Sequence, residues 1–183
     1  MKRTITKFGL ISGAIFAVSM SATVPFQDQI GFDRGLFLGY TMMVLSFLMV
    51  FFGIRSYRDN EGEGQISFGR AFGVGIGITL ISCVIYVVAW EIIYFNFMHD
   101  FMDKYAAYMA GKAKASGMSA AAIQAQLEAI KQAKASYENP LYNAAVTLIE
   151  PLPVGFLITL ISAALLRKKA RPEAAGAQVA ATS

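Results

Sequence analysis

Two glutamates lie within strongly apolar stretches of the sequence, and they are the residues best suited to chemistry. Glu91 falls in the stretch 68–98 and Glu150 in the stretch 141–166. A charged side chain at the centre of a bilayer costs about 2.5–3.5 kcal/mol or more, so such residues face a protein interior or a wet cavity. Asn143 precedes Glu150 by about two helical turns and shares its face in a regular helix. These three residues form a candidate intramembrane polar site.

This candidate site has two interpretations. A carboxylate and an amide beside a broken helix are typical of a group that binds a cation or relays a proton. Alternatively, protonated or hydrogen-bonded glutamates join the helices and have no further role. Pro151 and Pro153 follow Glu150, and proline removes a backbone donor, which leaves the Thr147 carbonyl without its usual partner. The sequence therefore predicts a helix kink at Pro151 and Pro153.

The sequence contains no recognisable set of residues for metal-dependent or nucleophilic catalysis. Cys83 is the only cysteine and His99 the only histidine, whereas a zinc site needs three or four ligands. The glycine-containing run 69–77 lacks the Lys-Ser/Thr pair and the preceding strand of a phosphate loop. We therefore expect no catalytic residue, no metal, no cofactor and no enzymatic activity.

The composition is that of a membrane protein. Of 183 residues, 56% are apolar and 15% charged, against roughly 45–50% and about 25% in soluble domains. A spanning helix needs ~20 predominantly apolar residues. The sequence predicts an all-α membrane protein whose single domain, residues 1–169, has four transmembrane helices at about 8–24, 36–54, 68–98 and 141–166.

The first apolar stretch has a rival interpretation as a signal peptide. Basic residues precede it, and the stretch 19–22 contains small residues resembling a signal-peptidase site, so cleavage of residues 1–22 is left open. However, small residues recur every four positions along it, at Gly9, Gly13, Ala17 and Ser21. This stripe is typical of a packing surface between membrane helices, which a discarded leader does not need. We expect the stretch to be retained.

Glycines of the third stretch are predicted to face this stripe. At about 100° per residue, Gly73 and Glu91 point the same way, and Gly69 and Gly77 lie about 40° to either side. Small residues let helix backbones approach closely. The predicted helix-packing positions are Gly9, Gly13, Ala17, Gly69, Gly73 and Gly77.

The Lys and Arg residues predict the orientation. With the N-terminus inside, ten of the 16 lie in inside segments and six outside, five of these in the segment 99–139. Long outer segments carry little weight in this rule. The predicted location is the bacterial inner membrane, multi-pass, with both termini cytoplasmic. Because the basic residues flank apolar stretches rather than gather on a water-facing element, no nucleic-acid partner is expected.

The segment 99–139 is predicted to form a helical hairpin outside the bilayer. Apolar residues recur at helical spacing on both sides of Gly117, and Ser119 suits a helix N-cap. The hairpin is interpreted either as a self-packed cap over the bundle or as a docking surface for a protein partner or ligand. The tail 170–183 is Ala-rich and predicted to be disordered.

Several short motifs resemble a known family. They are the run SFGRAFGVG at 67–75, DFMDKY at 100–105, GMS at 117–119 and PVG at 153–155. From about Thr6 to Lys169 the chain resembles the bacterial family called domain of unknown function 4199. The resemblance implies a four-helix bacterial membrane protein, and it carries no catalytic residue.

Two functions are compatible with these features. The first is a non-enzymatic structural or interaction module in contact with the lipid bilayer. The alternative is a small transporter or a proton or cation conduit that uses Glu91 and Glu150. Because four helices enclose little room, a conduit requires a homo-oligomer.

Overall fold

The computed structural model describes residues 1–168, and every element in this range is a helix. The predicted tail, residues 170–183, lies outside the described residues. The elements are α1 (Lys2–Thr23), the short 3-10 helix η1 (Val24–Phe26), α2 (Gln27–Asn60), α3 (Phe68–Phe97), α4 (Phe101–Ala115), α5 (Ala120–Tyr137), α6 (Pro140–Ile149) and α7 (Pro151–Leu166).

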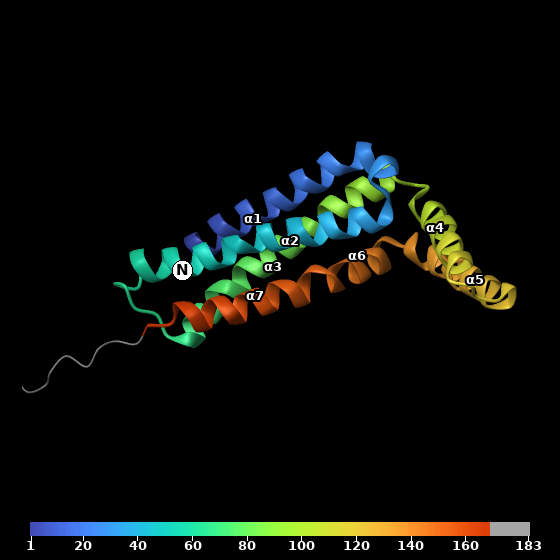
Figure 1. The fold of residues 1–183 in the computed structure, drawn as a ribbon. Helices are drawn as coiled ribbons and strands as arrows, with labels where there is room; N and C mark the ends of the chain where they lie inside the picture. The colour runs from blue at the N-terminus through green and yellow to red at the C-terminus, as the bar shows by residue number, and fades with distance from the viewer. Residues whose placement is uncertain (169–183) are drawn as a thin grey trace, which may run out of the picture.

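Three helical stretches are long and apolar enough to cross a membrane: Lys2–Asn60, Phe68–Phe97 and Pro140–Leu166. The helices therefore indicate a membrane protein. The first stretch, of 59 residues, turns back at η1, so that α1 and α2 lie side by side (Figure 1). The last two stretches match the predicted apolar segments closely. The helix α2 continues through Asn60, whereas its apolar part was predicted to end at about residue 54.

The helices α1 and α3 pack through glycines and run parallel. A Cβ atom added to Gly9 would lie 2.8 Å from Cβ of Ile81, and one added to Gly13 would lie 2.7 Å from Cβ of Ile85. On α3 the glycine is Gly77, and a Cβ added to it would lie 2.9 Å from the Ile5 side chain of α1. Each partner on α3 comes 72 positions after its partner on α1. The two backbones therefore keep one register along this contact.

Two of the glycines predicted to join this contact lie elsewhere. Gly69 and Gly73 are exposed, and no heavy atom lies within 4 Å of a Cβ added to either. The physical reason is the register, because Gly77 already lies opposite Ile5. Gly73 and Gly69 lie one and two turns before Gly77, in the part of α3 that extends past the start of α1 at Lys2. The close contact predicted at Gly69 and Gly73 is therefore absent. Ala17 of α1, which was also predicted as a packing position, is half-buried.

The core of the bundle lies among α2, α3 and α7. Phe47, Val50, Ile54, Val74 and Ile78 are completely buried there. Small and hydroxyl-bearing residues join the helices in the same region. A Cβ on Gly155 would lie 2.8 Å from the Phe47 ring, and Thr79 Oγ1 lies 3.0 Å from Thr159 Oγ1. Such close approach and interhelical hydrogen bonding are typical of helices that associate in lipid.

The predicted helical hairpin is present as α4 and α5. Gly117 adopts φ +75° between them, a conformation that favours glycine. The Ser119 hydroxyl then accepts a hydrogen bond from the amide of Ala122 at 3.3 Å and caps α5. In Figure 1 the hairpin projects beyond the end of the bundle, away from the ends at which α1 begins and α7 stops.

The α1–α3 contact makes a testable prediction. Gly13→Ala should destabilise the protein by about 1–3 kcal/mol, the usual cost of overpacking, because its Cβ would crowd Ile85. The matched control is Gly73→Ala, which meets open space and should be neutral or stabilising, since Ala is favoured over Gly in helices by about 1 kcal/mol. Unfolding by SDS titration, followed by circular dichroism, measures both. Equal stability of the two variants would contradict the described contact.

Candidate functional site

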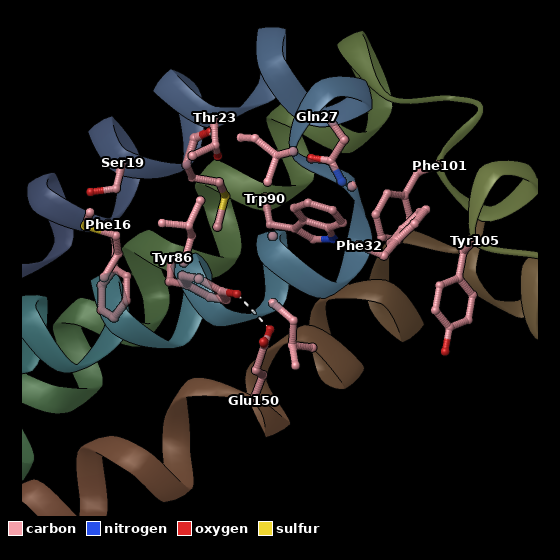
Figure 2. A pocket seen from close by; sticks show the side chains of 18 of the residues that line it. Phe16, Ser19, Thr23, Gln27, Phe32, Tyr86, Trp90, Phe101, Tyr105 and Glu150 are labelled. Carbon is pink, nitrogen blue, oxygen red and sulfur yellow. Dashed lines mark hydrogen bonds between the residues drawn. The ribbon is translucent and has the colours of Figure 1, made fainter. Parts of the chain in front are cut away.

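A cavity of about 420 Å³ lies near the hairpin end of the bundle. Its walls come from α1, the first half of α2, α3 and α4, and Tyr137 and Glu150 complete them (Figure 2). Most of the lining side chains are aliphatic or aromatic, with few polar groups among them. Volumes of roughly 300–1,000 Å³ with this kind of lining are typical of small-molecule sites.

Missing side chains on α2 leave this space open. Gly31, Gly35 and Gly39 recur every four residues and all line the cavity. Gly31 adopts φ +72°, which interrupts the regular helix, and nothing lies within 4 Å of a Cβ added to Gly39. These three residues were not predicted from the sequence, although their four-residue spacing is the same signal that identifies Gly9 and Gly13.

Among residues 1–168, Glu150 is the only acid on the cavity wall, and it lies at the junction of α6 and α7. The helix α6 ends at Ile149, and α7 begins at the buried Pro151, where the kink was predicted, while Glu150 between them keeps helical φ and ψ angles. The Tyr86 hydroxyl donates a hydrogen bond to Oε2 of Glu150 at 2.8 Å, as Figure 2 shows. The Tyr86 ring in turn packs edge-on against Phe16, with centroids 5.1 Å apart. The carboxylate is thus held at the wall by one defined contact.

Asn143 belongs to a hydrogen-bond network beside this carboxylate. Its amide nitrogen donates to the carbonyl of Tyr137 at 3.1 Å, and its amide oxygen accepts from Thr147 at 3.1 Å. The indole nitrogen of Trp90 donates to the Tyr137 hydroxyl at 3.0 Å. A second cavity, of about 270 Å³, shares Tyr86, Trp90, Phe101, Tyr137 and Glu150 with the first. Asn143 therefore positions Tyr137 and Thr147 rather than reaching Glu150 directly.

Glu91 lies apart from this group. It lines neither cavity, and it makes no hydrogen bond or ion pair with Glu150 or Asn143 within residues 1–168. Its Oε1 is buried without a hydrogen-bond partner. The structure therefore does not join Glu91 to the other two residues of the predicted polar site.

Contacts between the hairpin and the start of α2 position the outer wall of the cavity. The Phe32 ring packs against Tyr105 and Tyr108 at centroid distances of 5.6 and 5.0 Å. Asp33 accepts hydrogen bonds from Tyr108 at 2.6 Å and Lys112 at 3.0 Å. These bonds place Phe101, Met102 and Tyr105 of α4 along the cavity.

Hydrogen bonding also shifts the pKa values of Asp33 and Lys112, whose side chains are exposed. The Tyr108 and Lys112 bonds lower the pKa of Asp33 below its ordinary value of 3.8. The bonds to Tyr108 and Asp33 raise the pKa of Lys112 to about 12. A lowered carboxyl pKa contributes stability at neutral pH, which is lost as the pH falls below 3.8 through the lowered value. The contact is therefore intact across the physiological range.

Across residues 1–168, no group of three or more His, Cys, Asp and Glu side chains is placed to hold a metal ion. The cavity offers a carboxylate, a tyrosine hydroxyl and aromatic faces. These groups suit binding of an amphiphilic molecule, with its polar end at Glu150.

Comparison with known proteins assigns a family. No curated protein and no solved structure gave a match. The family match extends over residues 7–168, from the first turns of α1 to the end of the described chain. It confirms the predicted resemblance, and the chain belongs to the family described as protein of unknown function, DUF4199.

Proposed function

We propose that the protein crosses the bacterial inner membrane four times, with both termini in the cytoplasm. The antiparallel pair α1–α2, the parallel register of α1 and α3, and the return of α6 and α7 support this topology. The excess of Lys and Arg at the predicted inner segments supports the orientation. In this topology the hairpin of α4 and α5 lies outside the bilayer.

Within this topology, the protein acts as a non-enzymatic binding module that holds an amphiphilic molecule. The observation that carries this proposal is the cavity of about 420 Å³, to which the described part of the chain contributes mostly apolar walls and one carboxylate, Glu150. Apolar pockets with a few placed polar groups are the usual form of small-molecule sites. The apolar part of the ligand lies along the aromatic walls and its polar end lies at Glu150.

The hairpin takes part in this function because α4 supplies one wall. Phe101, Met102 and Tyr105 line the cavity, and the same helix is tied to α2 through Asp33. Occupation of the cavity is thus linked to the position of the hairpin, residues 99–139. In this topology the hairpin is also the surface that a protein partner outside the membrane would contact.

Filling the cavity tests the binding function. Gly39→Leu places a side chain into the open space beside Gly39, so it should weaken binding at least tenfold without disturbing the fold. The ligand is ω-bromoundecanol, added to the protein in a non-ionic maltoside detergent. Its bromine quenches the fluorescence of Trp90, the only tryptophan, which lines the cavity.

The matched control is Gly73→Leu, on an open face of α3 outside the cavity. It should quench as the unaltered protein does, with the same saturation. Quenching that does not saturate, or that saturates equally in Gly39→Leu, would show that this cavity is not the binding site.

A second candidate function is a proton or cation conduit formed by a homo-oligomer. One observation favours it: Oε1 of Glu91 is buried within the membrane-length helix α3 without a hydrogen-bond partner. Binding without transport instead predicts that vesicles containing the protein show no proton or potassium flux above empty vesicles. Flux that collapses in Glu91→Gln and in Glu150→Gln, while both variants stay folded, would establish the conduit in place of the binding module.

A further inference from the structure

The carboxylate of Glu150 has no cationic partner among the described residues. The ion pairs found within residues 1–168 do not include it, and its one hydrogen bond, from Tyr86, reaches Oε2. Glu150 lies ten residues after Pro140, where α6 begins, which is about 15 Å along a helix. The side chain is exposed, and in the proposed topology it lies within the hydrocarbon, where a carboxylate is costly unless a counter-charge accompanies it. The free Oε1 therefore lacks the group that would offset its charge.

Aromatic side chains line both cavities together with this carboxylate. Tyr86, Trp90, Phe101 and Tyr137 line both cavities together with Glu150, and Figure 2 shows Tyr86, Trp90 and Phe101 on the side of the cavity that Glu150 faces. Aromatic faces attract cations through their quadrupole, and Trp does so most strongly. A carboxylate with several aromatic neighbours is a suitable environment for an organic ammonium group.

Cationic side chains near the hairpin do not make this cavity a site for an anion. Lys104 pairs with Asp28 at 2.8 Å and with Asp100 at 3.0 Å, and Lys112 pairs with Asp33 at 3.0 Å. Neither lysine lines the cavity. An anionic head group would thus meet the Glu150 carboxylate without a compensating charge.

We propose that the ligand of this cavity is an amphiphilic amine, whose ammonium group pairs with Oε1 of Glu150 and whose apolar chain fills the space beside Gly35 and Gly39. This inference rests on the proposed binding function and names the chemical class of its ligand. The ammonium is held between the carboxylate and the aromatic faces of Tyr86 and Trp90. The Tyr86 hydroxyl keeps the carboxylate turned toward the cavity.

The test compares two ligands that differ only in their head group, ω-bromoundecylamine and ω-bromoundecanol. Both are titrated into the full-length protein in maltoside detergent at pH 7, and quenching of Trp90 is followed. The amine should bind at least tenfold more tightly than the alcohol. Glu150→Gln should remove this preference, so that amine and alcohol bind with similar affinities, because the glutamine keeps the shape of the wall but not its charge.

Glu91→Gln is the matched control, since it removes a membrane carboxylate of α3 that lines neither cavity. It should retain the preference for the amine. Loss of the preference in Glu91→Gln to the same extent would overturn the assignment to Glu150. Equal affinities for amine and alcohol in the unaltered protein would overturn the ammonium inference and leave the binding function standing, whereas no saturable quenching by either would remove both.

A competition experiment separates two sources of the ammonium. Phosphatidylethanolamine added to the micelles should not displace the bromoamine, because its phosphate would meet the Glu150 carboxylate. The ligand is then a single-charge amine. Displacement by phosphatidylethanolamine but not by phosphatidylglycerol would overturn the single-charge assignment and identify an aminolipid as the source of the same ammonium chemistry.

Discussion

The close contact between α1 and α3 fixes the register of the two helices against which α2 packs. In lipid there is no hydrophobic force to bring apolar helices together, so close packing of small residues must do so. Gly9 and Gly13 accept Ile81 and Ile85, and Gly77 accepts Ile5, so the two helices lie parallel in one register. Large side chains of α2, such as Phe47, and small residues of α7, such as Gly155 and Thr159, then pack against α3. The first half of α2 carries glycines instead, and the cavity follows from that difference.

The two irregularities of the bundle meet at this cavity. Gly31 interrupts α2 on one wall, and the break before Pro151 places Glu150 on another. Ion pairs and aromatic contacts at the base of the hairpin supply the remaining wall. The cavity is therefore a consequence of where regular packing stops, and its carboxylate lies where a helix is interrupted.

Much of the fold follows from the sequence, because length and apolarity determine what crosses a bilayer. The stretches predicted at 68–98 and 141–166 correspond to Phe68–Phe97 and Pro140–Leu166, and Gly117 and Ser119 mark the hairpin turn. Helical arithmetic identified the face of Gly69 and Gly73, but it contains no information on where a neighbouring helix begins, and these residues face open space. In the same way, periodicity cannot show that Glu91 and Glu150 lie apart. The four-residue spacing of Gly31, Gly35 and Gly39 on α2 is visible in the sequence, but the cavity beside these glycines was not predicted.

The account depends on α1 and α2 each crossing the membrane, with the hairpin outside. Site-directed labelling tests this most directly, with single cysteines at Gln29, Gln65 and Ser116 in a Cys83→Ala background and an epitope tag at the N-terminus. In intact spheroplasts an impermeant maleimide should label positions 29 and 116, while position 65 and the tag should become accessible only after permeabilisation. Protection of position 29 together with labelling of position 116 would show that the α1–α2 pair does not span the membrane twice, and would contradict the account.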